Sequence, residues 1–342
     1  MVAILISILP GVWLIPILTG RKSTYLLVRL LFALTSDKLG DPMRKVVITG
    51  ASGLLGRALV REFRKQSGFT VIATAFNRAN TDLVKLDLLD FDSVSEFLLL
   101  HKPDFIIHAA AERRPDVCQN NPEATKVLNI HATENIARVA SQIESWMLYI
   151  STNYVFDGTS PPYTPTSDTN PLNLYGESKL EGERAMWQNV VSGGSLRLPI
   201  LYGKVETLDE SSVTQIVKAV VSRSEIEIDD WATRHPTFVD DVACVCRQIL
   251  EYRTQNPSFN GTYHWSGNQP ITKYHMARIM AEVLGVDVDH IAPAKHPPIG
   301  APRPRNCQLD CSDLESLGIG KQTGFVEAIR IALASMGGVF DL

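Results

Sequence analysis

Tyr175 and Lys179 stand four residues apart in the segment 174–180, a spacing that places both side chains on one face of a helix. A neighbouring ammonium favours the phenolate and lowers the pKa of a tyrosine, which can then exchange a proton with a carbonyl or alcohol oxygen. Thr152 follows an apolar segment and can hydrogen-bond the same oxygen. The three residues predict a site for carbonyl reduction. The alternative is a surface pair, because Tyr and Lys on a helix are common.

A glycine-rich turn is predicted at residues 50–56. Gly50, Gly53 and Gly56 recur at three-residue spacing after the apolar run 46–48 and before the amphipathic segment 57–63. Glycines let the backbone turn tightly and approach a ligand, while the free N–H groups and the dipole of the following helix favour an anion. The pattern predicts a pyrophosphate site. The alternative is a turn that binds nothing.

The segment after the second apolar run bears on the choice of dinucleotide. For NAD, an acidic residue there would accept a hydrogen bond from the ribose hydroxyl, but residues 74–78 contain no acid. Arg78 can instead pair with a 2′-phosphate. The sequence therefore predicts NADP(H) rather than NAD as cofactor, unless Arg78 is simply a solvated loop charge.

Apolar strands alternate with helical segments over most of the chain. We expect strands at 46–48, 69–75, 84–88, 104–110, 146–151 and 195–198, and helices at 57–63, 92–101, 124–142 and 178–189. This alternation predicts an α/β fold, a Rossmann-type doubly wound parallel sheet with a smaller C-terminal substrate-binding lobe. The expected division is an apolar N-terminal extension at 1–43, an NADP-binding domain at 44–198 and the smaller lobe at 199–342.

The composition of the 342 residues is ordinary for a globular protein, with 45% hydrophobic and 20% charged residues. The net charge of −4 gives no broad basic surface, so we expect no nucleic-acid partner. The five cysteines form no convincing zinc pattern, which predicts no metal site and fits reduced thiols in the cytoplasm.

The N-terminus departs from this ordinary composition. Residues 1–20 carry no charged side chain, and a second apolar run follows at 25–34. Twenty uncharged residues can span a bilayer, but Pro10, Gly11 and Pro16 interrupt the helical pattern and no basic segment precedes the apolar run. Membrane contact by residues 1–34, organelle targeting, a disordered extension and a wrongly assigned gene start all stay open.

The motif Thr49-Gly50-x-x-Gly53-x-x-Gly56, together with Thr152, Tyr175 and Lys179, resembles the extended short-chain dehydrogenase/reductases. The segment 151–158 is similar to that of dTDP-4-dehydrorhamnose reductases, which usually have aspartate where this chain has Asn153. The resemblance implies a second hypothesis, an NADPH-dependent reductase of a nucleotide-sugar ketone. In that reductase Tyr175 would be the proton donor, Lys179 its pKa modulator and Thr152 the carbonyl ligand.

Other segments resemble a narrower family, the beta (regulatory) subunits of methionine adenosyltransferase. They are 110–117, 171–176, 196–203, 242–248, 264–268 and 303–312. The resemblance implies a protein that associates with the catalytic methionine adenosyltransferase subunit and modulates S-adenosylmethionine synthesis in one-carbon metabolism. The family's basic and aromatic C-terminal tail has no match in residues 337–342.

The same resemblance implies a set of NADP(H) contacts. They are Ser52, Gly53, Leu54, Leu55, Phe76, Asn77, Arg78, Asp87, Leu88, Ala109, Arg113, Tyr175, Lys179 and Leu201. Because the regulatory family keeps the reductase triad, Thr152, Tyr175 and Lys179 do not decide whether the chain is an enzyme. Tyr175 and Lys179 would serve in either case to hold the nicotinamide ribose.

Overall fold

The computed structural model describes residues 43–78, 82–222 and 224–334, and the described residues from Arg44 onward form one compact unit. Residues 1–42 of the predicted N-terminal extension (1–43), the expected membrane contact within them and the C-terminal residues 335–342 lie outside the described residues. Among the helices that the structure describes, none is long and apolar enough to cross a membrane.

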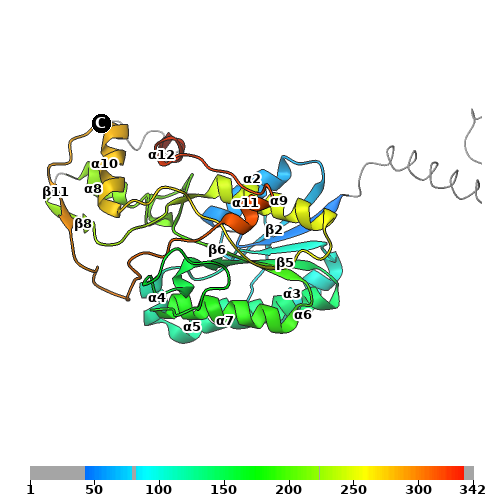
Figure 1. Cartoon of the computed structure of the whole chain (residues 1–342). Helices are drawn as coiled ribbons and strands as arrows, with labels where there is room; N and C mark the ends of the chain where they lie inside the picture. Colours follow the sequence, from blue (N-terminus) through cyan, green and yellow to red (C-terminus); the bar gives the residue numbers. More distant parts are fainter. Residues whose placement is uncertain (1–42, 79–81, 223, 335–342) are drawn as a thin grey trace, which may run out of the picture. The chain divides into compact units, whose positions relative to one another are not determined.

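A seven-stranded sheet forms the centre of the unit (Figure 1), and each strand runs parallel to its neighbours. Its spatial order is β10-β6-β5-β4-β1-β2-β3. The central strands β1, β4 and β5 are apolar because helices cover both of their faces. The strands are β1 (Arg44–Thr49), β2 (Phe69–Ala75), β3 (Val84–Lys85), β4 (Phe105–His108), β5 (Trp146–Thr152), β6 (Gly193–Leu198) and β10 (Gly261–His264).

Helices cover the sheet on both sides, as the predicted doubly wound fold requires (Figure 1). One face carries α2 (Leu54–Arg64), α9 (Val239–Gln255) and α11 (Ser312–Ser316). The other carries α3 (Phe91–His101), α4 (Pro115–Asn120), α5 (Pro122–Lys126), α6 (Ala132–Gln142) and α7 (Leu174–Asn189). A π-helical turn, Val127–His131, joins α5 to α6, so the single helix predicted at 124–142 is three successive helical segments.

A second group of elements has its own apolar cluster, which includes Val217, Met276 and Ile329. Two short parallel strand pairs accompany its helices. The elements are β7 (Leu201–Tyr202), α8 (Ile216–Val221), β8 (Ile226–Asp229), β9 (Thr237–Phe238), α10 (Lys273–Leu284), β11 (Ile291–Ala294) and α12 (Phe325–Ala334). Two single 3-10 turns, Asn153–Val155 and Leu208–Glu210, complete the described secondary structure.

The chain returns to the sheet after this second group has begun. Strand β10 pairs with β6, and α9 packs on α2 and contributes Val242, Cys246 and Ile249 to the main core. The predicted boundary between residues 198 and 199 therefore cuts through the sheet, because the edge strand β10 follows this boundary in the sequence. The regular alternation of strands and helices stops at this point because α9 and β10, which pack on the sheet, lie far along the chain from β6.

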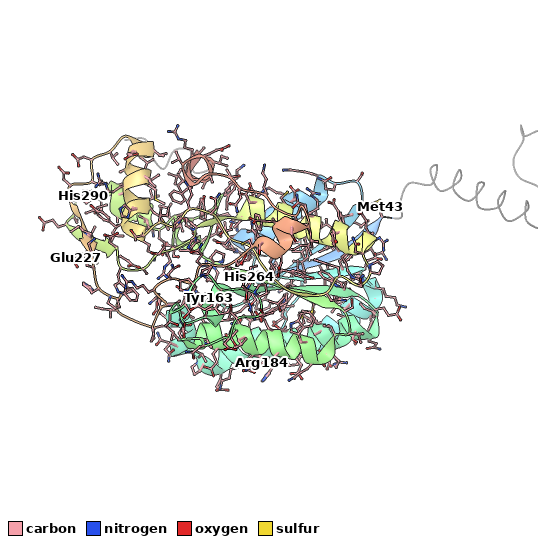
Figure 2. All side chains as sticks on the ribbon, in the orientation of Figure 1. Met43, Tyr163, Arg184, Glu227, His264 and His290 are labelled. Atoms are coloured by element: carbon pink, nitrogen blue, oxygen red, sulfur yellow. The ribbon has the colours of Figure 1, made fainter. Side chains whose placement is uncertain are left out.

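A buried ion pair attaches α7 to the sheet. Arg197 on β6 donates from Nη2 to Glu183 Oε2 at 2.7 Å and from Nε to Glu183 Oε1 at 2.9 Å, and the Ser151 hydroxyl on β5 donates to the same carboxylate. Both charged side chains are almost fully buried, at 6% and 4% exposure. By contrast, Arg184, the next residue of α7 and labelled in Figure 2, lies on the outer face of the helix.

This contrast predicts very different effects for two neighbouring substitutions. Glu183→Gln leaves the Arg197 guanidinium buried without its counter-charge, so we expect the free energy of unfolding to fall by about 3 kcal/mol. Glu181→Gln removes only an exposed partner of Arg184, and we expect a loss below about 0.5 kcal/mol. Urea denaturation measures both. Equal losses would mean that the buried pair does not anchor α7.

Candidate functional site

The predicted site residues gather at one edge of the sheet, where the carboxyl ends of the parallel strands meet. Gly50 follows β1, Arg78 follows β2 and Ala109 follows β4. Thr152 is the last residue of β5, and its register partner on β6 is Leu198. The sequence placed these residues in separate segments, and the sheet brings them to a common edge.

The glycine turn has the close contacts that only glycine allows. Gly50 has a φ of +67°, and a Cβ there would lie 2.8 Å from the backbone N of Ala110. A Cβ on Gly56 would lie 2.1 Å from the Gly50 carbonyl oxygen. Gly53 differs, because its Cβ would meet only that oxygen, at 3.2 Å, and would otherwise project into open space. Two glycines thus close the turn, and the third keeps its outer side free.

The outer side of the turn suits an anion. Helix α2 begins directly after Gly53 with no side-chain cap and no acidic residue in its first turn. The first N–H groups and the positive dipole end of the helix, whose first residues are Leu54 and Leu55, therefore face the turn that carries Ser52. An adjoining cavity of about 240 Å³ is lined by Ala51, Ser52, Arg57, Val60, Arg61, Arg64, Arg78, Asp82, Leu83 and Glu206. The residues present fit a nucleotide that carries phosphate groups.

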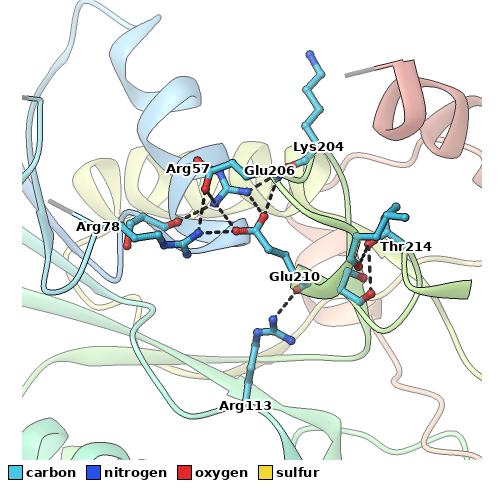
Figure 3. Close-up of polar contacts among 10 residues, drawn as sticks. Arg57, Arg78, Arg113, Lys204, Glu206, Glu210 and Thr214 are labelled. Carbon is cyan, nitrogen blue, oxygen red and sulfur yellow. Dashed lines mark hydrogen bonds and ion pairs between the residues drawn. The ribbon is translucent and has the colours of Figure 1, made fainter. Parts of the chain in front are cut away.

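Arg78 has acidic partners that the sequence did not reveal. Its Nη1 lies 2.9 Å from Glu206 Oε2 and 2.6 Å from Glu210 Oε1 (Figure 3). Arg57 joins the same cluster, with Nη1 donating to Glu210 Oε1 at 3.1 Å and to the Ser52 carbonyl at 2.7 Å. Two carboxylates from residues 204–211 thus lie beside Arg78, although residues 74–78 themselves contain no acid. No local pattern marked Arg57, Glu206 or Glu210 as part of the site.

The remaining predicted contacts line the same edge with different exposure. Phe76 is 48% exposed just after β2, whereas Leu88 is buried. Asp87 accepts a hydrogen bond from the Leu89 backbone N at 2.9 Å. Arg113 Nη2 donates to the Glu210 carbonyl oxygen at 2.5 Å. The last two predicted contacts are Asn77, which is exposed after β2, and Leu201, which is half-buried on β7.

The residues predicted to transfer a proton lie at the start of α7 and at the end of β5. Helix α7 begins at Leu174, where the Asn173 side chain accepts from the Gly176 backbone N, and it carries Tyr175 and Lys179 one turn apart. The Thr152 side chain is a hydrogen-bonding neighbour of the Tyr175 phenol. The position of α7 follows from close packing, since a Cβ on Gly176 would lie 2.2 Å from the Tyr154 carbonyl oxygen.

The expected effect of Lys179 on Tyr175 is wrong. Burial raises the pKa of Tyr175 to about 12, against the opposing effect of its hydrogen bond with Thr152. The Lys179 ammonium instead stands 3.9 Å from the centroid of the Tyr149 ring. Burial also lowers the pKa of Lys179 to about 7, although the Glu183 carboxylate opposes this. Desolvation outweighs the attraction between the pair that the i, i+4 spacing suggested.

The chain has relatives over nearly all of its described length. The family model of the RmlD substrate binding domain matches residues 43–337. Methionine adenosyltransferase 2 subunit beta of Bos taurus is 46% identical over 302 residues, which cover 88% of this chain and 90% of the relative. The match to the family model and the 46% identity to this relative show to which protein family the chain belongs.

Two solved structures share the fold. A dTDP-4-dehydrorhamnose reductase of Clostridium acetobutylicum has a TM-score of 0.76 at 25% identity, with 85% of this chain and 99% of that chain covered. A dTDP-4-dehydrorhamnose reductase of Bacillus anthracis in complex with NADP has a TM-score of 0.74 at 24% identity, with 86% and 99% covered.

The lowered pKa of Lys179 predicts a pH-dependent contribution to stability. The lysine binds its proton less tightly in the folded chain, at a pKa of about 7, than at the unfolded value of 10.5. Between these values the unfolded state binds more protons, so the cost of burying Lys179 diminishes as the pH rises. We therefore expect the free energy of unfolding of the native protein, relative to Lys179→Met, to increase from pH 7 to pH 10.

Denaturation at several pH values measures this difference. Lys126→Met is the matched control, because Lys126 is an exposed lysine that pairs with Glu123 on the surface. Its difference from the native protein should stay flat over the same range. A flat difference for Lys179→Met as well would show that Lys179 keeps an ordinary pKa in the folded chain.

Proposed function

This chain belongs to the family of the RmlD substrate binding domain and, within it, to the methionine adenosyltransferase beta subunits, and we propose that it is an NADP(H)-binding regulatory subunit. Its partner would be a catalytic methionine adenosyltransferase, whose synthesis of S-adenosylmethionine it modulates. The 46% identity to a protein named as subunit beta carries the regulatory half of the proposal. The glycine turn beside an arginine-lined cavity supports the cofactor half.

In this proposal the sheet edge holds the dinucleotide. The turn at Gly50–Gly56 and the first N–H groups of α2 bind the pyrophosphate. Arg78 binds the 2′-phosphate, and Tyr175 with Lys179 holds the nicotinamide ribose. NADPH supplies a hydride when bound. The other proposed contacts are Ser52, Leu54, Leu55, Phe76, Asn77, Asp87, Leu88, Ala109, Arg113 and Leu201.

The electrostatics of the triad support a binding role. A general acid works best when its pKa lies near the working pH, and the pKa of Tyr175 is raised to about 12 by burial. Lys179, whose pKa is lowered to about 7 by the same cause, is only partly charged at neutral pH, and the pKa of Tyr175 stays raised beside it. Both side chains can still form hydrogen bonds to a ribose. A regulatory subunit needs this binding but not the proton transfer.

A second candidate function is an NADPH-dependent reductase resembling dTDP-4-dehydrorhamnose reductase. The observation that favours it is the placement of Thr152 beside the Tyr175 phenol. In such an enzyme Tyr175 would donate its phenolic proton to the carbonyl oxygen of the substrate, and Thr152 would hydrogen-bond that oxygen. Lys179 would hold the ribose of the cofactor.

We also propose a cytoplasmic location and a functional division of the chain. All five cysteines are free thiols, which fits a reducing compartment. Residues 44–198 would supply the cofactor contacts apart from Leu201, and residues 199–342 the smaller lobe. Membrane anchoring or organelle targeting by the N-terminal extension concerns residues outside the described part of the chain.

The open side of Gly53 predicts a clean loss of cofactor binding. A side chain at Gly53 meets only the Gly50 carbonyl oxygen, at 3.2 Å, so Gly53→Val should leave the fold intact. The added methyl groups would occupy the space of the pyrophosphate, and we expect calorimetry to detect no NADP binding. Gly68→Val is the matched control, since a Cβ there has no atom within 4 Å. A folded Gly53→Val variant that binds NADP normally would remove this turn from the site.

Tyr175→Phe separates the two candidate functions. The substitution keeps the ring but removes the phenolic hydroxyl, and with it one hydrogen bond to the ribose and the proton that a reductase would transfer. Lys179 and the glycine turn still hold the cofactor, so at saturating NADP(H) the modulation of S-adenosylmethionine synthesis by the reconstituted pair should stay within about twofold of native. If the chain is a reductase, NADPH oxidation with dTDP-4-dehydrorhamnose should fall about 100-fold or more. The regulatory proposal fails if the native protein neither binds nor alters the catalytic subunit at micromolar concentration.

A further inference from the structure

One acidic segment, Lys204–Ser211, lies across the cofactor edge of the sheet and is held there by three arginines (Figure 3). Arg57 lies in α2, the helix after β1, whereas Arg78 and Arg113 lie in the loops after β2 and β4. Arg57 and Arg78 contact carboxylates of the segment, and Arg113 Nη2 contacts the Glu210 carbonyl oxygen at 2.5 Å. The segments that follow β1, β2 and β4 thus each contribute one arginine that contacts residues 204–211.

The two carboxylates of the segment occupy different environments. Glu210 is only 13% exposed, and its carboxylate bridges Arg57 and Arg78 while it accepts from the Glu206 backbone N at 3.0 Å. Although burial opposes the shift, hydrogen bonds from Arg57 and Arg78 lower the pKa of Glu210 to about 2. Glu210 is therefore a fixed part of the segment.

Glu206 has the opposite character. Its side chain is 57% exposed, it lies 2.9 Å from Arg78 Nη1, and Arg57 Nη1 is farther away at 3.6 Å. Exposed ion pairs of this kind are weak and exchange readily with other charged partners. Glu206 also lines the 240 Å³ cavity beside the glycine turn, whereas Glu210 is absent from that lining. Of the two carboxylates that line this cavity, that of Glu206 contacts Arg78, whereas that of Asp82 lies 3.8 Å from Arg64 Nη1.

We propose that Glu206 is a specificity-determining residue that competes with the 2′-phosphate of the cofactor for Arg78. The inference rests on the proposed binding of NADP(H) at this turn. A phosphate monoester carries a charge of about −1.5 to −2 and three acceptor oxygens, so it displaces a single exposed carboxylate from a guanidinium. A 2′-hydroxyl has no such charge and leaves the pair of Glu206 and Arg78 in place. Glu206 therefore narrows the preference for NADP(H) over NAD(H) that Arg78 alone would give.

The test compares two small probes that differ only in the contested group, 2′,5′-ADP and 5′-AMP. Removal of the competing charge in Glu206→Gln should lower the Kd for 2′,5′-ADP about three- to fivefold, the scale of an exposed ion pair. The Kd for 5′-AMP should stay within about twofold of native. NADP and NAD should repeat the pattern.

Asp209→Asn is the matched control. Asp209 lies in the same segment, is 62% exposed and pairs with Lys218 rather than with Arg78. The substitution Asp209→Asn also removes one negative charge from this segment. We expect it to leave the ratio of the Kd values for 2′,5′-ADP and 5′-AMP unchanged. In an Arg78→Ala background the effect of Glu206→Gln should disappear, because the contested guanidinium is gone.

The outcomes separate this inference from the function on which it rests. If native protein binds NADP but Glu206→Gln leaves the ratio unchanged, Glu206 is not the competitor and the cofactor proposal stands. If Asp209→Asn shifts the ratio equally, the effect is a general charge effect and the inference is wrong. If native protein binds neither NADP nor 2′,5′-ADP, the cofactor proposal fails and this inference fails with it.

Discussion

The buried pair of Arg197 and Glu183 is the interaction on which the arrangement of the site depends. Two charges taken out of water are tolerated only when each satisfies the other, and here the pair joins β6 to α7 with a hydroxyl from β5. This attachment fixes the height and rotation of α7 over the sheet. Gly176 and Gly182 then let the helix approach Tyr154 and Tyr149 closely. Lys179 consequently lies against the sheet rather than in solvent.

The same burial decides what the triad can do. In water, an ammonium one helical turn from a phenol would stabilise the phenolate. Here desolvation raises the pKa of Tyr175 and lowers that of Lys179, so both groups are driven towards their neutral forms. Neutral donors are well suited to hold a ribose.

Electrostatics also connect the two parts of the chain. The acidic segment Lys204–Ser211 follows β7 in the sequence. It contacts Arg57, Arg78 and Arg113, which come from the segments after β1, β2 and β4. Its carboxylates neutralise arginines that would otherwise repel one another across a small cavity. An anion that enters this cavity therefore meets arginines that already have carboxylate partners.

The sequence by itself determined the features that rest on short-range patterns. Alternating strands and helices gave the parallel sheet, glycine spacing gave the turn, and the four-residue interval placed Tyr175 and Lys179 on one helix face. Tertiary structure alone decided the partners of Arg78, since Glu206 lies 128 residues away. It also decided the return of β10 to the sheet and the contact of Lys179 with Tyr149. Periodicity reports how a segment folds on itself, whereas charge pairing and desolvation depend on which distant segments become neighbours.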